Sequence, residues 1–290
     1  MKSNLAEHSK RFEVQDYDLA ATLNSGQAFR WQFKDGWWVG VIGQRWVRLK
    51  GDEFLIRAEA AEPMQSWDWL ADYLQVGVDV REVVRSFPKD EPMRAAVNAC
   101  RGLRLLRQDP WECLASFILS STKQIVQIQQ IIRIVTERFG EAIACSPEYG
   151  RAYGFPCPAR LARATEKDLR ECKMGFRAPY LLGTARSVAE GALDLARLRH
   201  VGVATARETL MELPGVGRKI ADCVLLFAYG YQAAFPVDVW VIKALRQSYF
   251  PGKRVKIKTL HEFAGGHFSP WSGYAQQYLF HWMRTRPAGK

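Results

Sequence analysis

The sequence predicts an α+β fold in which a small antiparallel β-sheet precedes a mainly helical remainder. Residues 29–57 alternate apolar and polar side chains between turn signals, a pattern typical of an antiparallel meander. After about Pro88 the apolar residues recur with helical spacing, and Gly and Pro separate the segments. We therefore expect a sheet domain over residues 1–88 and a helical domain or domains over 89–290, in a chain long enough to bury both cores.

Turns and caps mark the individual elements. The predicted sheet turns at Lys34-Asp35-Gly36, at Gly43 and at Lys50-Gly51-Asp52. One long helix is predicted from Pro110, with Asp109 as its N-cap, to a stop at Gly140. Further helices are predicted over residues 160–173, 178–192, 204–213, 217–230, 239–249 and 273–284.

Composition limits the classes of function. The chain has 41 Lys and Arg against 30 Asp and Glu, a formal charge of +11, which favours a polyanionic partner, nucleic acid before an anionic membrane. Without a signal-peptide pattern or an apolar run of about 18 residues, we expect a soluble intracellular protein. The basic segment 252–258 is interpreted first as a solvated loop and second as a strip that contacts nucleic-acid backbone.

Cysteines and histidines give no pattern of a metal site. The six cysteines lack C-x-x-C spacing, and we interpret them as free thiols that lie mostly in the core. His261 and His267 are six residues apart, so they do not share one helical face, and a metalloprotease is excluded.

The segment from Leu213 to Cys223, "LPGVGRKIADC", predicts a helix, a glycine-containing turn and a second helix. Amides that open a helix can hold a phosphate without reading base sequence, so Gly215, Val216, Gly217 and Arg218 are candidate backbone contacts. The segment is not a Walker A loop, because the Gly-Lys-Ser/Thr ending is missing. The alternative is an αα-hairpin with a structural role only.

Lys219 and Asp238 are the candidate catalytic residues. A lysine in the first turn of a helix faces the positive end of the macrodipole, and the apolar helix behind it opposes ionisation as well. Both effects favour the neutral amine that a nucleophile needs. Asp238 follows Pro236 and is expected to cap the next helix, which would fix a carboxylate in place beside the amine, although a cap alone is the structural alternative.

These residues resemble the helix-hairpin-helix base-excision glycosylase superfamily, whose signature is the hairpin, a following lysine and an aspartate about twenty residues later. The stretches "NSGQAFRW" (24–31), "LLRQDPWECLASFILSS" (105–121) and "YAQQYLF" (274–280) narrow the resemblance to the 8-oxoguanine DNA glycosylases. This family implies a TBP-like sheet followed by a helical domain that contains the hairpin at about 204–230. It also implies a bifunctional glycosylase and AP lyase acting on flipped 8-oxoguanine.

The resemblance assigns further roles. The Gly26 carbonyl would accept the N7–H that 8-oxoguanine has and guanine lacks. Phe280 and Cys223 would sandwich the base, and Gln276 would read its Watson–Crick edge. Phe176 and Arg177 match a wedge aromatic and an arginine that contacts the orphan cytosine. Each of the four base-pocket positions also has a structural interpretation: a turn glycine, a core aromatic, a small buried residue and an exposed helix position.

The sequence departs from the family pattern after Ser121. Eukaryotic members have asparagines there and an arginine one turn later, whereas this chain has Thr122, Lys123, Gln124 and then Gln127. Thr122, Lys123 and Gln127 are therefore the candidate contacts to the duplex, and we expect relaxed preference for the opposite base. The family's histidine two residues after the aspartate is Trp240, which puts one phosphate contact in doubt.

The expected partner is duplex DNA containing 8-oxoguanine, with no membrane, and the expected state is a monomer in the cytoplasm or nucleoid, or in the nucleus of a eukaryote. No cofactor is expected to be required, and no iron–sulfur cluster, because no cysteine follows Cys223. A structural cation at the hairpin carbonyls is implied by the family. Two alternatives stay open: a related enzyme for another oxidised or alkylated base, and a non-catalytic hairpin that only grips DNA.

Overall fold

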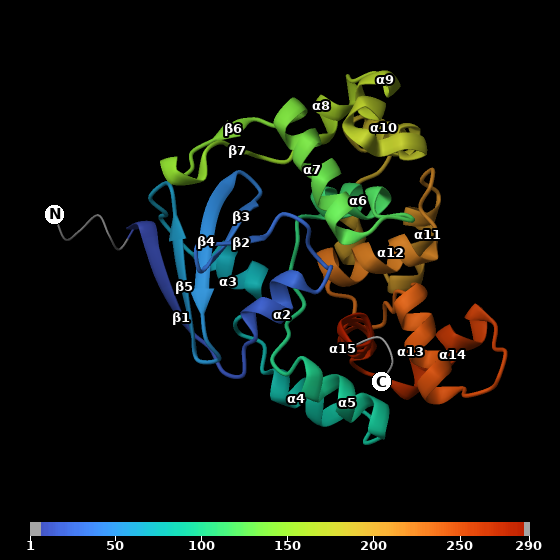
Figure 1. Ribbon diagram of the computed structural model, residues 1–290. Coiled ribbons are helices and arrows are strands. Elements are labelled where there is room, and N and C mark those ends of the chain that lie inside the picture. The colour runs from blue at the N-terminus through green and yellow to red at the C-terminus, as the bar shows by residue number, and fades with distance from the viewer. Residues whose placement is uncertain (1–6, 287–290) are drawn as a thin grey trace.

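The computed structural model describes residues 7–286 and places an antiparallel five-stranded sheet beside a larger group of helices (Figure 1). The strand order is β1-β5-β4-β3-β2, so the meander predicted over 29–57 is confirmed. The sequence analysis missed β1, which pairs with β5 and sets Phe12 opposite Ile56. The strands are β1 (Ser9–Glu13), β2 (Gln32–Lys34), β3 (Trp37–Ile42), β4 (Arg45–Gly51) and β5 (Leu55–Ala60).

The sheet is built on a two-residue turn and one buried face. Asp35 and Gly36 both have positive φ, 51° and 78°, as the turn between β2 and β3 requires. Side chains alternate along β4 and β5, and Leu49 and Ile56 are fully buried on the inner face. Two helices, α2 (Leu19–Asn24) and α3 (Asp68–Leu74), pack their apolar side chains into this same core.

The remaining chain is mainly helical, which confirms the predicted fold class. The helices over 178–192, 204–213, 217–230, 239–249 and 273–284 each have a counterpart, and the second of the hairpin helices continues through a π-helical turn at Leu225–Tyr229. The helices are α4 (Val80–Ser86), α5 (Glu91–Ala99), α6 (Pro110–Leu119), α7 (Ile125–Phe139), α8 (Pro158–Ala162), α9 (Glu166–Leu169), α10 (Ala178–Ala189), α11 (Val203–Met211), α12 (Arg218–Val224), α13 (Val239–Tyr249), α14 (Ile257–His267) and α15 (Ser272–Thr285). A short hairpin of β6 (Ala142–Ile143) and β7 (Ala152–Tyr153) lies between α7 and α8.

The single helix predicted over 110–139 is wrong: the segment forms two helices, α6 and α7. Asp109 does cap α6, since its carboxylate accepts a bond of 2.8 Å from the Glu112 amide. The chain then leaves the helix at Ser120, and Thr122 has φ of 55°, a left-handed conformation that no helix interior accommodates. Apolar periodicity continues across the break because both helices face the same core.

Two further predictions need correction. The helix predicted over 160–173 is interrupted, because the Thr165 hydroxyl accepts a bond from the Asp168 amide and begins a new helix. The segment 252–258 is a loop only as far as Lys256, since α14 begins at Ile257, a helix that the sequence analysis did not predict. Of the cysteines, Cys145 and Cys157 are the two that lie outside the core, and all six are free.

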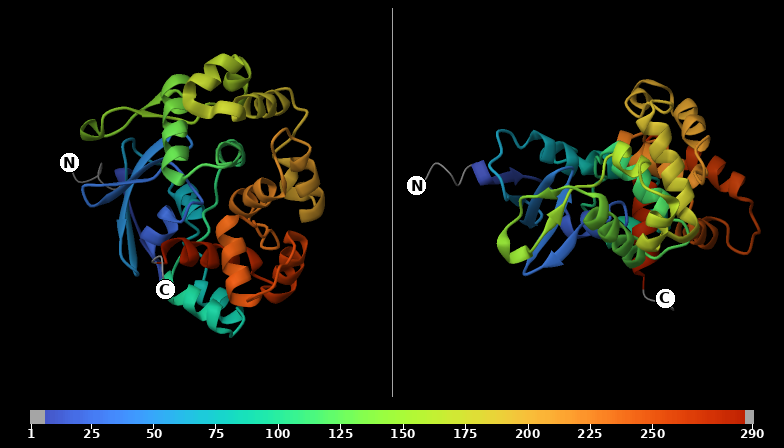
Figure 2. Two further views of the ribbon diagram at one scale, coloured as in Figure 1. Left: turned by 45° about the vertical axis from the view of Figure 1, so that its right-hand side comes forward. Right: turned by 90° about the horizontal axis from the view of Figure 1, so that it is seen from above.

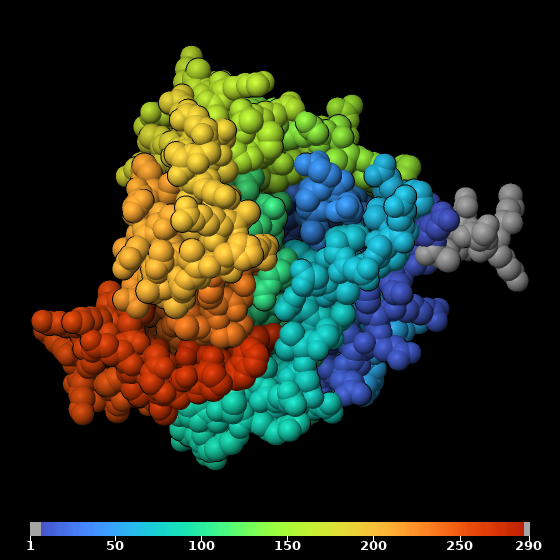
Figure 3. Space-filling view, turned by 180° about the vertical axis from the view of Figure 1, so that it is seen from behind, coloured from blue at the N-terminus to red at the C-terminus, as the bar shows by residue number. Residues whose placement is uncertain are grey.

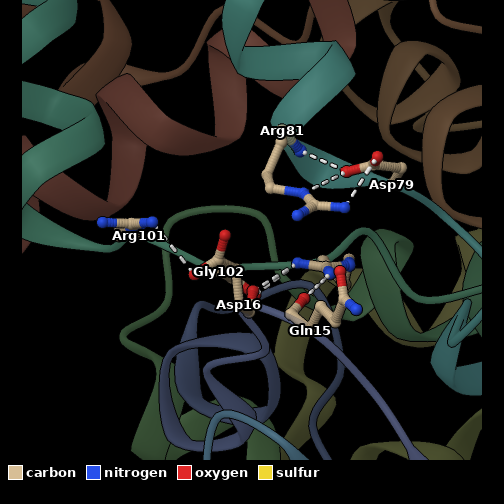
Figure 4. Close-up of polar contacts among 7 residues, drawn as sticks. Gln15, Asp16, Asp79, Arg81, Arg101 and Gly102 are labelled. Atoms are coloured by element: carbon tan, nitrogen blue, oxygen red, sulfur yellow. Dashed lines mark hydrogen bonds and ion pairs between the residues drawn. The ribbon is translucent and has the colours of Figure 1, made fainter.

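The sheet and the helices have separate hydrophobic cores that meet along residues 103–108. Leu105 belongs to the helical core and Leu106 to the sheet core. The Arg104 guanidinium is buried beside Tyr17 and donates to the carbonyls of Gln15, Asp16 and Gly102. Figure 4 shows the bonds around Gln15, Asp16 and Gly102, where the Arg101 guanidinium also lies 3.0 Å from the Asp16 carboxylate.

The last helix returns to the N-terminal part of the chain. In Figure 2 the helices form an arc, and α15 ends beside α2, where the Gln277 amide bonds to the Ser25 carbonyl. Figure 3 shows the opposite face, on which the teal segment that contains α5 adjoins the C-terminal helices in red. Residues far apart in sequence are thereby brought to one place.

Candidate active site

The candidate site is an open cavity of about 690 Å³ lined by parts of the chain that are distant in sequence. The loop after α2, the break between α6 and α7, helix α12, the start of α13 and helix α15 all line it. The residues predicted from the sequence that line the cavity are Gly26, Thr122, Lys123, Lys219, Cys223, Asp238, Gln276 and Phe280.

The hairpin of α11 and α12 presents Lys219 to the cavity. Val216 is buried and anchors the turn, whereas Gly215 and Gly217 are exposed. Gly215 has φ of 76°, and a Cβ there would lie 2.4 Å from the Tyr180 ring, so only glycine fits. Arg218 is exposed at the start of α12, as a backbone contact would require.

Lys219 is half-buried and points at polar and aromatic neighbours from α6. Its Nζ donates to the Ser120 hydroxyl at 3.4 Å and lies 5.3 Å from the centre of the Phe117 ring. Within the described chain it has no carboxylate within ion-pair distance. The amine is therefore held in position without being neutralised by a salt bridge.

Asp238 caps α13, as predicted, and lines the same cavity as Lys219. Its Oδ1 accepts a bond of 2.8 Å from the Val241 amide. Burial raises the pKa of this carboxyl above its ordinary value, while the Val241 N–H and the nearby Lys219 charge act in the opposite direction. The arrangement places a fixed carboxylate and an amine in the lining of one cavity.

Cys223 and Gln276 offer the cavity a neutral thiol and an unused amide. Burial raises the pKa of the Cys223 thiol to about 12, so it is not a thiolate at neutral pH. Gln276 is only 3% exposed, and its Oε1 has no hydrogen-bond partner in the described residues. A buried acceptor without a partner is costly, so this oxygen is available to a ligand that enters the cavity.

Gly26 and Phe280 are neighbours in the cavity lining. Gly26 has φ of 77°, and a Cβ at this position would lie 2.9 Å from Ile125 Cδ1 and 3.4 Å from Phe280 Cε1. The glycine therefore provides both the backbone conformation and the space. The Phe280 ring is half-buried and has the Arg284 guanidinium 5.6 Å from its centre.

Phe176 and Arg177 lie outside the cavity lining. Phe176 is 52% exposed, and its ring has the Arg177 guanidinium 4.2 Å from its centre. Arg177 itself is only 2% exposed, because it donates to the Ser121 carbonyl and, at 2.6 Å, to the Thr122 hydroxyl. In this structure it is bonded to the break between α6 and α7.

Gln127 also lies outside the lining. Its Oε1 accepts a bond of 3.1 Å from the Gln124 amide at the start of α7. Its side chain therefore has a structural use in this structure.

Several lining residues were not predicted from the sequence. Ser120 lies at the α6–α7 break, and Phe117 and Ile125 lie in the helices on either side of this break, which the uninterrupted periodicity concealed. Trp240 is 36% exposed at the rim, and in the sequence it appeared only as a departure from the family pattern. Arg284 is four residues after Phe280, and this spacing on a helix is the signal that could have found it.

Residues 7–286 contain no group of three or more His, Cys, Asp or Glu side chains placed to hold a metal ion. In the same range, none of the helices has the length and apolar character needed to cross a membrane.

The helix-hairpin-helix, the lysine after it and the capping aspartate together define a DNA base-excision glycosylase. Residues 115–265 match the HhH-GPD superfamily of base excision DNA repair proteins, and residues 10–114 match the N-terminal domain of 8-oxoguanine DNA glycosylase. The chain therefore belongs to the 8-oxoguanine DNA glycosylase family of bifunctional N-glycosylase/DNA lyases.

Named relatives agree with this assignment. A probable N-glycosylase/DNA lyase of Methanothermobacter thermautotrophicus is 30% identical, over 94% of this chain and 96% of its own length. The N-glycosylase/DNA lyase OGG1 of Arabidopsis thaliana is 31% identical, over 90% of this chain and 76% of its own. The Clostridium acetobutylicum 8-oxoguanine glycosylase/lyase, solved with duplex DNA containing cytosine opposite 8-oxoguanine, superimposes with a TM-score of 0.88 at 30% identity, covering 96% of this chain and 98% of that one.

Proposed function

We propose that the protein excises 8-oxoguanine from duplex DNA and then cleaves the strand at the resulting abasic site. The observation that carries this proposal is that one cavity holds Lys219, Asp238 and the unpartnered amide oxygen of Gln276. The reactive amine and a receptor for a polar base edge are therefore in the same space. A stacked base cannot enter that space, so the target nucleotide must first be flipped out of the duplex.

Lys219 is the proposed nucleophile. Its Nζ lone pair forms a bond to C1′, the glycosidic bond breaks, and its electrons leave with the base, which takes up a proton. Loss of a proton from nitrogen and opening of the sugar give a Schiff base. Asp238 stabilises the positive charge that develops on the sugar while the glycosidic bond breaks. After the Schiff base has formed, removal of a C2′ proton expels the 3′ phosphate by β-elimination.

Four residues are proposed to recognise the base. The Gly26 carbonyl would accept the N7–H of 8-oxoguanine, whereas guanine would set a lone pair against a lone pair. Gln276 would bond to the Watson–Crick edge. Phe280 and the neutral Cys223 thiol would cover the two faces of the ring, for which apolar contact is sufficient.

The duplex contacts are proposals of the same kind. The turn from Gly215 to Arg218 would hold the DNA backbone through exposed amides and one guanidinium. Phe176, exposed and supported by Arg177, would fill the space that the flipped base leaves. Thr122, Lys123 and Gln127 complete the proposed contacts near the opposite strand.

We also propose that preference for the opposite base is relaxed. Of two arginines in the family pattern only Arg177 is present, and here it is bonded to Ser121 and Thr122. Single-turnover excision opposite C, A, G and T tests this hypothesis. A preference for C of about a hundredfold, equivalent to about 2.7 kcal/mol, would overturn it.

Several broader expectations belong to the same proposal. The enzyme would act as an intracellular monomer without a required cofactor or iron–sulfur cluster, with a structural cation at the hairpin carbonyls as an added expectation. The division into units at residue 88, with the hairpin in the second unit, is likewise proposed.

Borohydride trapping on a duplex with one 8-oxoguanine tests the proposed activity. Wild-type protein should form a covalent adduct, and Lys219→Gln should bind the duplex without forming it. Lys219→Arg keeps the charge, so retained binding with lost excision separates nucleophile from phosphate contact. Binding without an adduct in the wild type would indicate a non-catalytic hairpin, and an adduct only with another damaged base would change the substrate.

A further inference from the structure

The loop that carries Gly26 is held by side chains that donate to the carbonyls around it. Gln277 Nε2 donates to the Ser25 carbonyl at 3.0 Å, and Gln108 Nε2 donates to the Gln27 carbonyl at 2.7 Å. The Arg284 guanidinium donates to the Asn24 carbonyl. Two of the three bonds come from α15 and the third from the segment 103–108, so the loop is held on both sides of Gly26.

The Gln27 side chain also fixes this loop, through hydrogen bonds to backbone groups. It is fully buried, and its Nε2 donates to the Thr22 and Arg104 carbonyls at 2.9 and 2.8 Å. Its Oε1 accepts a bond of 2.8 Å from the Leu106 amide. The loop is thus tied to residues 104–106, where the two hydrophobic cores meet.

The carbonyl of Gly26 itself is left open. Among the described residues no hydrogen bond to it is present, while the carbonyls of residues 24, 25 and 27 are all occupied. Gly26 lines the cavity, so the one unoccupied acceptor of this loop belongs to the residue at the site.

Helix α15 both lines the cavity and holds the loop. Gln276 and Phe280 line the cavity, and Gln277, only 2% exposed, makes the bond to Ser25. Helix α15 would then set two contacts to the base. Gln276 contacts the Watson–Crick edge directly, and Gln277 positions the Gly26 carbonyl on the opposite side. A shift of the loop would change the distance between Gly26 and Gln276 but not the position of Lys219 on α12.

We propose that Gln277 is a positioning residue that sets discrimination between 8-oxoguanine and guanine by fixing the Gly26 carbonyl through Ser25. The inference rests on the proposed function. At the Gly26 carbonyl, 8-oxoguanine makes a hydrogen bond where guanine meets a lone-pair repulsion. The strengths of both interactions depend steeply on distance and angle. Chemistry at an abasic sugar has no base to recognise, so it does not need this carbonyl.

The variant Gln277→Leu keeps the side-chain volume and removes the donor. We expect single-turnover excision of 8-oxoguanine to fall about tenfold, the factor for roughly one lost hydrogen bond. In a Lys219→Gln background, the binding preference for 8-oxoguanine over guanine duplexes should fall by about the same factor. Cleavage of a preformed abasic site should stay within about twofold of wild type, because Lys219 is undisturbed.

Tyr278→Phe is the matched control. Tyr278 is the next residue of α15, is fully buried, and donates to the Leu103 carbonyl at 3.3 Å, away from the loop. It should lose stability without losing base preference. Gln108→Leu, which releases the other end of the loop, should repeat the effect of Gln277→Leu. It is the test variant if Gln277→Leu does not fold.

The outcomes separate the inference from the function beneath it. An unchanged base preference in Gln277→Leu, or an equal loss of abasic-site cleavage and excision, overturns the positioning role. If the wild type leaves 8-oxoguanine in place, the proposed function fails first. If it excises 8-oxoguanine and Tyr278→Phe loses preference as much as Gln277→Leu, the role belongs to helix stability and not to Gln277.

Discussion

At the residue scale, Asp238 has two roles with opposite effects on stability. It caps α13, and it supplies the buried charge of the proposed chemistry. The capping bond to Val241 stabilises α13, and asparagine at the same position would keep that bond. Burial raises the pKa of the carboxyl, so the ionised form costs the folded state more than the unfolded state. The charge proposed for catalysis is therefore held at the expense of stability.

Asp238→Asn should raise the free energy of unfolding at pH 7 and lower excision by about a hundredfold or more. Since the folded pKa lies above the unfolded one, the wild type loses stability relative to the variant as pH rises through the folded pKa. Urea unfolding from acid to neutral pH measures this difference. A variant less stable than wild type at pH 7 would show that the cap needs the charge.

Gly26 is the second residue whose identity is set by the site. In Gly26→Ala the positive φ costs about 1–2 kcal/mol of stability. The added Cβ would also displace Ile125 and Phe280, so the variant should lose 8-oxoguanine excision while it still cleaves preformed abasic sites. Gly43→Ala is the control, because Gly43 also has positive φ and open space around it. Equal excision by the two variants would contradict the prediction.

At the element scale, the hairpin depends on a buried carboxylate between its helices. Asp222 on α12 accepts a bond of 2.6 Å from Arg207 Nε on α11, and Arg218 Nε lies 3.6 Å from its other oxygen. The Asp222 side chain is 1% exposed. Burial raises the pKa of this carboxyl, and both arginines oppose that shift. The Arg207–Asp222 pair links the two helices, and Asp222 also holds the Arg218 side chain at the start of α12.

Removing one member of this pair should leave a buried, uncompensated charge. Asp222→Ala is expected to lose about 3 kcal/mol of unfolding free energy, measured by urea denaturation. Glu137→Ala breaks the exposed pair with Arg133 and should cost less than about 1 kcal/mol. Replacing both Arg207 and Asp222 by apolar residues should recover much of the loss. If the double variant is as unstable as Asp222→Ala, packing and not charge explains the result.

Elements with strong local signals could be predicted from the sequence. The hairpin, the Asp238 cap and the β2–β5 meander each depend on residues close together in the chain. The break after α6 could not be predicted, because apolar spacing continues through it while Thr122 leaves the helix. Its consequence for the site is large, since Ser120, the hydrogen-bond partner of Lys219, lies in that break.

At the scale of the whole molecule, the site is assembled from parts of the chain that are distant in sequence, and local patterns do not specify such an assembly. The resemblance to a family named several of the residues that line the cavity, but not the bonds that fix them. Arg177 was expected to face DNA, whereas the structure holds it against Ser121 and Thr122. The side chains on the Gly26 loop join residues about 80 and 250 positions apart, beyond the reach of periodicity.

The net charge of +11 makes a prediction about the molecule as a whole. Binding to duplex DNA should weaken with salt, because each phosphate contact releases counterions and adds about 0.9 to the slope of log K against log salt. Arg218→Gln should reduce the magnitude of this slope by about one, and equally for damaged and undamaged duplexes, because phosphate contacts carry no base information. Arg57→Gln, at an exposed position of β5 in the sheet, keeps the same net charge as Arg218→Gln and is the control. Equal slopes for the two variants would mean that the overall field of the protein, and not the hairpin, accounts for the salt dependence.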